Sequence, residues 1–222
     1  MRVPLLLVAL AVSVGAAPPN WTRTVTNQNG AYVIGNPKAK VRVVEYTSYT
    51  CSHCATFARE GQPKLMAQVA RGTVAFEIRN AVRDKLDFAD AVAARCGGPA
   101  RFVGHHDAIF AAQEQLGQRT EAWQAGAGKT APTDANAGLK ALARGSGLTA
   151  LMARRGLTPS ALDACLTSKA AQAPVLAMTN DAWNVRKIAG TPAFLVDGEV
   201  VQAASFETLD PFIRARLTAT PS

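Results

Sequence analysis

Two short β-branched runs stand out in the first half of the chain. Residues 40–46 (KVRVVEY) and 73–79 (TVAFEIR) are apolar-rich and brief, and they predict strands. Residues 55–72 between them carry apolar side chains at broadly helical spacing. Gly61 and Pro63 interrupt that spacing, so we expect a kinked or two-part helix. A strand, a helix and a second strand in this order predict a parallel crossover unit.

Helical periodicity dominates from about residue 84 to residue 187, where the composition becomes rich in alanine. The stop Gly97-Gly98-Pro99 ends one helix, and Thr158 is placed as the N-cap of another. Beyond this region, Asp197-Gly198 lies between two apolar runs and predicts a hairpin of two strands. Ser205 then predicts the N-cap of a closing helix.

These patterns divide the chain into a sheet-forming part and a helical part. We expect an α/β fold whose sheet domain comprises residues 18–83 and 188–222, with residues 84–187 inserted as a helical domain. The polar segment 18–38 is expected to form a loop. A chain of 222 residues is long enough for one domain with a sizeable insertion.

The N-terminus has the pattern of a secretory signal peptide. Arg2 precedes an apolar run from Val3 to Val14, and small residues follow, with cleavage expected near Ala16 or Ala17. The apolar run is shorter than the roughly 20 residues that span a bilayer. We therefore expect residues 1–17 to be removed and the mature protein to be secreted or periplasmic, where disulfides persist.

Charge narrows the function classes further. The formal net charge of the chain is +8, spread over separated Lys and Arg side chains. Three Tyr and three Trp are not interleaved with the basic residues. This distribution favours solubility and argues against a nucleic-acid partner.

The four cysteines, Cys51, Cys54, Cys96 and Cys165, allow three disulfide pairings. Close spacing favours a pair between Cys51 and Cys54, which leaves Cys96 and Cys165 either bridged or as two free buried thiols. A zinc site at the first pair would need two further ligands with their own short spacing, and none is present, so we expect no metal.

Two adjacent histidines, His105 and His106, are a second candidate ligand pair. Neighbouring helical residues point about 100° apart. We therefore expect an exposed helix face at these positions rather than a metal site.

The Cys51-Ser52-His53-Cys54 motif comes directly after a predicted strand, at the start of a predicted helix. Free backbone N–H groups and the helix dipole stabilise negative charge there, so the Cys51 thiol is expected to lose its proton easily. His53 is close enough to add a donor or a positive charge. Cys54, one turn into the helix, is then the resolving thiol.

Three features carry a family resemblance: VVEYTSYTCSHC at 43–54, the helical insertion, and GTPAFLVDGEVV at 190–201. With them, the chain resembles the DsbA-like thiol:disulfide oxidoreductases of the thioredoxin superfamily. The resemblance implies a thioredoxin fold interrupted by a helical domain. It also implies that Cys51 is the nucleophile, that Pro192 is a cis-proline facing it, and that the backbone of Thr191 pairs with an extended substrate. No organic cofactor is implied.

Glu45 lies six residues before Cys51, where the DsbA-like pattern has a buried acid. The hydrophobic periodicity alone leaves two environments open for Glu45. Its side chain either faces solvent on an edge strand or is buried. The resemblance favours a buried carboxylate that moves protons to and from Cys54. One branch of the family has a second disulfide in its helical domain, so the resemblance also favours a structural bridge between Cys96 and Cys165.

By this resemblance the protein oxidises reduced, unfolded secreted proteins in the periplasm and is itself reoxidised by a membrane partner of the DsbB kind. The alternatives are an isomerase or reductase kept reduced by a membrane donor, and a thioredoxin-fold chaperone or binding module. Thr191 before the proline resembles the isomerase branch, and Ser52 replaces a proline of the strong oxidases. Isomerases carry an N-terminal dimerisation domain, which segment 18–38 is too short to supply.

Overall fold

The computed structural model describes residues 19–219, so the expected signal peptide lies outside the described residues. Its centre is a six-stranded sheet with the strand order β1-β2-β4-β3-β5-β6. The strands are β1 (Val25–Gln28), β2 (Ala31–Gly35), β3 (Val41–Thr47), β4 (Val74–Asn80), β5 (Ala193–Val196) and β6 (Glu199–Val201).

Ten α-helices accompany the sheet within the described residues. Three of them, α1, α2 and α10, belong to the sheet-forming part, and the other seven follow one another between β4 and β5. The helices are α1 (Ser52–Thr56), α2 (Gln62–Ala70), α3 (Lys85–Arg95), α4 (Pro99–Ala111), α5 (Gln113–Ala125), α6 (Ala135–Gly145), α7 (Leu148–Arg154), α8 (Pro159–Thr167), α9 (Lys169–Asn180) and α10 (Phe206–Thr218).

The expected crossover unit is present, because β3 and β4 pair in parallel and the helical segment between them starts beside Cys51. Its two-part helix is also present. A π-helical turn, Phe57–Gly61, joins α1 to α2. A Cβ on Gly61 would lie 2.5 Å from the Phe57 ring, so only glycine lets the ring pack here. Beyond this turn α2 packs on the sheet, whereas α1 begins at the cysteines, just after the C-terminal end of the central strand β3.

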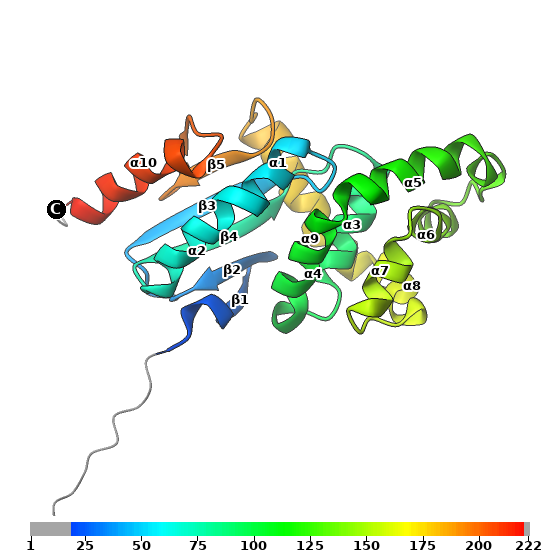
Figure 1. The fold of residues 1–222 in the computed structure, drawn as a ribbon, viewed down its shortest axis with the longest axis horizontal. Helices are drawn as coiled ribbons and strands as arrows, with labels where there is room; N and C mark the ends of the chain where they lie inside the picture. Colours follow the sequence, from blue (N-terminus) through cyan, green and yellow to red (C-terminus); the bar gives the residue numbers. More distant parts are fainter. Residues whose placement is uncertain (1–18, 220–222) are drawn as a thin grey trace, which may run out of the picture.

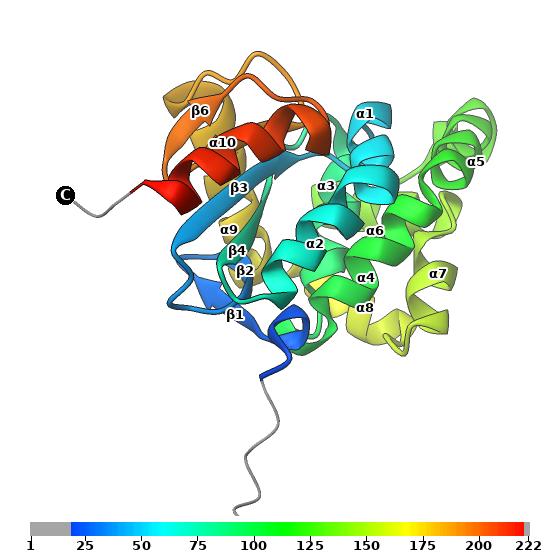
Figure 2. The same ribbon diagram turned by 60° about the vertical axis from the view of Figure 1, so that its left-hand side comes forward.

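The sheet lies between two helical layers (Figures 1 and 2). Helices α1, α2 and α10 cover one face, and α9 packs on the other. Alternation along β3 divides its side chains accordingly, since Val43 joins the large core on the α2 side and Val44 joins the smaller cluster on the opposite side. Strand β3 is central, paired with β4 on one side and with β5 on the other.

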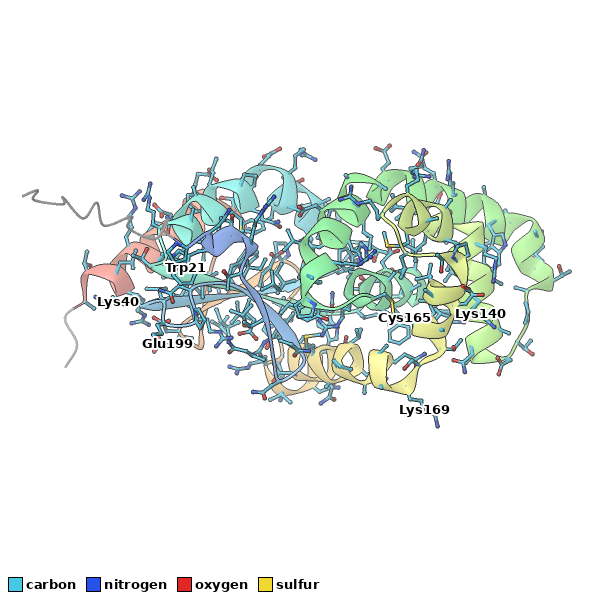
Figure 3. The ribbon with its side chains drawn as sticks, turned by 90° about the horizontal axis from the view of Figure 1, so that it is seen from below. Trp21, Lys40, Lys140, Cys165, Lys169 and Glu199 are labelled. Atoms are coloured by element: carbon cyan, nitrogen blue, oxygen red, sulfur yellow. A yellow bond between two sulfur atoms is a disulfide. The ribbon has the colours of Figure 1, made fainter. Side chains whose placement is uncertain are left out.

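Helices α3 to α8 form a helical lobe beside the sheet (Figure 1), and their buried side chains join the same large core as the sheet. Inside this lobe, Cys96 and Cys165 form a disulfide, although they are 69 residues apart in the sequence. Figure 3 labels Cys165. Closing a loop of this length removes unfolded-chain entropy worth roughly 4 kcal/mol.

Several sequence predictions about local structure are confirmed. Thr158 is the N-cap of α8, Ser205 forms a capping box at the start of α10, and β5 and β6 pair as a hairpin around Asp197-Gly198. Together β5, β6 and α10 complete the sheet domain from the C-terminal end of the chain.

Two expectations are wrong. The segment 18–38 is not a loop, because it contains β1 and β2. These two strands pair with each other, and β2 also pairs with β4 inside the sheet. Its strand β2 is buried at every position, so apolar packing outweighs the polar residues around it. His105 and His106 are also buried, not exposed, and the ring nitrogens of His106 lie within hydrogen-bond distance of the Tyr49 hydroxyl and the Gln62 side chain.

None of the described helices is long and apolar enough to cross a membrane.

Candidate active site

Cys51 lies at the N-cap of α1, directly after the loop that leaves β3. Its backbone is extended, with φ −92° and ψ 118°, and its N–H donates to the carbonyl of Ser48 at 3.2 Å. The carbonyl of Cys51 accepts from the N–H of Ala55 at 3.1 Å. This cap geometry turns the first backbone N–H groups of α1 toward the Cys51 sulfur. Cys51 and Cys54 are both free thiols, so the structure describes the reduced form.

The pKa of the Cys51 thiol is lowered from 9.0 to about 4. The largest cause is a hydrogen bond to the thiolate from Cys54, and burial acts in the opposite direction. The Thr191 side chain and the backbone N–H groups of Cys54 and His53 contribute further hydrogen bonds. The protonated thiol can instead donate to the Thr191 carbonyl, which is 3.1 Å away. Cys51 is therefore ionised at neutral pH, as a nucleophile must be.

Cys54 has the opposite environment. It is fully buried, and burial, the hydrogen bond to Cys51 and the negative charge of Glu45 raise its pKa. The thiol therefore holds its proton while Cys51 loses one. This difference between two neighbouring thiols is what an attacking and a resolving cysteine require.

Glu45 is 2% exposed and lies in the central strand β3, between Ile78 of β4 and Phe194 of β5. Glu45 is therefore the buried carboxylate of the two alternatives, not a solvent-facing glutamate on an edge strand. Glu45 has the same strand parity as Val43, so it faces the layer of α1 and α2, where Cys54 lies. Burial raises the pKa of Glu45 from 4.5 to about 8, so the group can hold or release a proton near neutral pH.

Replacing Glu45 by glutamine is expected to stabilise the protein by about 3 kcal/mol at pH 7. Because the folded-state pKa lies above the unfolded one, native stability is lost as the pH rises from 4.5 toward 8, and an amide does not incur this loss. Urea unfolding at pH 4 and pH 7 measures the effect, and no gain is expected at pH 4.

The matched control is Glu77→Gln on the adjacent strand. Glu77 is equally buried, but it pairs with Arg42 and Arg79, so this variant should lose stability at pH 7. A destabilised Glu45→Gln protein at pH 7 would contradict the argument.

Thr191 and Pro192 join the site from the other end of the chain. The peptide bond between them is cis, as expected, and the Thr191 carbonyl faces the Cys51 sulfur. Beside them is a hollow of about 380 Å³, lined mainly by apolar residues that include Pro192 and Val201. Val200 on its rim is 51% exposed. An extended apolar segment could therefore lie close to the reactive sulfur.

His53 supplies a donor to Cys51 from its main chain. Its side chain is exposed and lines the hollow beside Thr191, and its backbone N–H is the group that donates to Cys51. A contribution of the His53 side chain to the thiolate stays a prediction.

The loop before Cys51 is held by residues that sequence reasoning missed. Asp87 of α3 accepts from the Ser48 hydroxyl at 2.6 Å and from the Tyr49 N–H at 2.7 Å. Asp84, the N-cap of α3, accepts from the Thr50 hydroxyl at 2.6 Å. Burial raises the pKa of Asp87 to about 6. The capping preference of aspartate could have located Asp84, but nothing in the sequence connects either residue to this loop.

Within residues 19–219, no group of three or more His, Cys, Asp or Glu side chains could hold a metal ion.

Comparison with known proteins decides the family. A family model described as thioredoxin matches residues 27–215, which is far more than half of the chain. The chain belongs to the thioredoxin family.

Individual relatives of this thioredoxin-family protein agree with that assignment. A crystal structure of a protein-disulfide isomerase from Novosphingobium aromaticivorans has 35% sequence identity and a TM-score of 0.77, and the match covers 86% of this chain and 98% of that chain. The crystal structure of the oxidoreductase DsbA from Xylella fastidiosa has 25% identity and a TM-score of 0.56 over 84% of this chain and 96% of that chain.

A Rickettsia prowazekii protein with the provisional name protein-disulfide oxidoreductase is 28% identical over 179 residues, which are 80% of this chain. The chain spans 58% of the length of that relative. The family and the thioredoxin-like fold expected from the sequence are therefore confirmed, and the relatives with solved structures include a DsbA.

Proposed function

We propose that this protein is a thiol:disulfide oxidoreductase that introduces disulfides into reduced, unfolded secreted proteins in the periplasm. The observation that carries the proposal is the contrast between the two thiols, since the Cys51 pKa is lowered to about 4 and the Cys54 pKa is raised. A stabilised Cys51 thiolate favours the reduced enzyme over the disulfide. A dithiol that is stable when reduced is a strong oxidant when its cysteines are joined.

The reaction begins with the Cys51–Cys54 disulfide. A substrate thiolate attacks the Cys51 sulfur, a mixed disulfide forms, and Cys54 leaves as a thiolate that takes a proton, for which Glu45 is the nearby buried donor. A second thiolate of the substrate then attacks the substrate sulfur that is bonded to Cys51. The substrate disulfide forms, and Cys51 leaves as the stabilised thiolate. Two electrons pass from the substrate to the enzyme. A membrane partner of the DsbB kind would remove them, and the pattern of residues 1–17 supports export to that compartment.

Substrate binding in this proposal uses the Thr191 backbone and the hollow beside Pro192. The Thr191 carbonyl is 3.1 Å from the Cys51 sulfur, and Thr191 and His53 both line the hollow, whose apolar lining suits the side chains that unfolded chains expose. The Cys96–Cys165 disulfide has a structural role, because it lies in the helical lobe, apart from the helix start that activates Cys51.

Disulfide isomerase or reductase is the second candidate. The relative with 35% identity is a protein-disulfide isomerase, and Thr191 before the cis-proline resembles that branch. An isomerase must be kept reduced, so the two functions differ in the redox state of Cys51 in its own compartment.

Equilibration with glutathione separates the candidates. We expect a reduction potential nearer to the value of about −120 mV for DsbA than to about −270 mV for thioredoxin, because the thiolate is stabilised to a similar degree. The oxidised protein should also transfer its disulfide to a reduced, unfolded test protein in one-to-one proportion. A potential near the thioredoxin value, without net oxidation of the test protein, would reject the oxidase and leave the reductase or isomerase.

A further inference from the structure

Gln113, the first residue of α5, reaches from the helical lobe into the loop that precedes the active-site helix. Its side-chain Nε2 donates to the carbonyl oxygen of Tyr49 at 2.8 Å and to that of Cys51 at 2.9 Å. Both acceptors are backbone carbonyls, so only the nitrogen of the side-chain amide can face them, and its orientation is fixed by its partners. Figure 1 shows α5 running outward from beside the loop that enters α1.

The Cys51 carbonyl is a sensitive place for such a contact. Rotation about ψ of Cys51 moves this carbonyl, and it also swings the N–H groups of His53 and Cys54 relative to the Cys51 sulfur. The Ala55 N–H already holds the carbonyl from the helix side at 3.1 Å. Gln113 holds it from the opposite lobe, so the ψ value of 118° is fixed by two donors instead of one.

Gln113 is complementary to the two carboxylates on the other side of the loop. Asp84 and Asp87 accept hydrogen bonds from the loop's hydroxyls and from the Tyr49 N–H. Gln113 supplies the matching donor to the loop's carbonyls. The Tyr49 residue is thus bound at its N–H by α3 and at its carbonyl by α5.

We propose that Gln113 is a positioning residue for the redox reaction, and that its amide fixes the Cys51 main chain so that the thiolate stays in front of its hydrogen-bond donors. The role rests on the proposed function, because it concerns the same sulfur. Through Gln113, the helical lobe influences how strongly the Cys51 thiolate is stabilised.

Gln113→Met tests the role, because methionine has similar length and helix propensity but neither a donor nor a charge. The Cys51 thiolate is titrated by its ultraviolet absorbance, and the protein is equilibrated with glutathione. We expect the Cys51 pKa to rise by about one unit and the oxidising equilibrium constant at pH 7 to fall about tenfold, which equals about 30 mV. Gln118→Met is the matched control, since Gln118 is exposed on the same helix and bonds only within it, to Glu114.

Gln113→Glu is the second variant. It keeps the shape of the side chain and suits the dipole of α5 in its first turn, but its carboxylate cannot donate to the Tyr49 and Cys51 carbonyls and repels them. A negative charge beside the Cys51 carbonyl should raise the thiolate pKa further than methionine does. Thermal unfolding of every variant shows whether the fold is intact.

An unchanged Cys51 pKa in folded Gln113→Met protein would overturn the proposal, even if Gln113→Glu raised the pKa, because charge alone would then explain the effect. Lower thermal stability with an unchanged pKa would show that Gln113 only supports the fold. If instead the parent protein fails to oxidise its test substrate, the proposed function fails, while the comparison of pKa values still tests Gln113.

Discussion

Serine in place of Cys51 is expected to abolish disulfide exchange completely. Substrate must attack the Cys51 sulfur, because the Cys54 sulfur is fully buried and its thiol has a raised pKa. Cys54 alone can neither form the internal disulfide nor act as an accessible nucleophile. The rate of disulfide transfer to a reduced, unfolded protein measures the effect.

Cys54→Ser should behave in the opposite way. Cys51 keeps its position at the N-cap of α1 and still attacks disulfides, but nothing resolves the mixed disulfide that forms. Covalent complexes should therefore accumulate, visible on non-reducing gels and lost on addition of a reductant.

The control is a double variant, Cys96→Ala with Cys165→Ala, which also removes cysteines but leaves Cys51 and Cys54 in place. As long as it is folded, it should exchange disulfides at the parent rate. Exchange by Cys51→Ser at the parent rate would show that another sulfur is the nucleophile.

The second large effect concerns stability. The reduced protein is expected to be more stable than the oxidised one by about 2–4 kcal/mol at pH 7. The folded-state pKa of Cys51, about 4, lies below the unfolded value of 9.0. Its contribution is therefore complete above pH 9 and is lost as the pH falls toward 4. Cys51 is 4% exposed, but the neighbouring His53 is exposed to solvent, so the lower end of this range allows for solvent screening of the thiolate charge.

Urea unfolding of both redox forms from pH 4 to pH 9 measures this difference. The gap between the two forms should close near pH 4, because the thiolate is then protonated in the folded state also. Reduced Cys51→Ser protein should lack this pH dependence, since serine has no thiolate to stabilise. An oxidised form that is more stable than the reduced form at pH 7 would contradict the oxidase proposal.

The sequence predicted the parts of this site that depend on local structure. The start of α1 at Cys51, the hairpin at Asp197-Gly198 and the cap at Ser205 each follow from short-range rules of turn and helix geometry. The strands at residues 25–28 and 31–35 were missed, because a short strand with few neighbouring signals depends on its partner strand, which the sequence does not reveal.

Local patterns could not predict contacts across long sequence distances, and the two that were expected, Cys51 with the Thr191-Pro192 turn and Cys96 with Cys165, came from the family resemblance. Gln113 lies 62 residues from Cys51, and Asp87 lies 38 from Tyr49. Only the packing of the helical lobe against the sheet brings them together. The burial of Glu45 required the knowledge that β3 is central, and this depends on β5, which follows about 150 residues later.

The division of the sheet between the two ends of the chain has a consequence for biogenesis. Cys51 precedes Thr191 by 140 residues, so a growing chain exposes both redox cysteines long before β5 can complete the site. Cys96 is the next thiol to emerge, and in an oxidising compartment it competes for the same partners until Cys165 follows. The chain must therefore pair its own cysteines while its catalytic centre is still unassembled. Under the proposed oxidase function, a newly made copy would itself be a substrate for copies that have already folded.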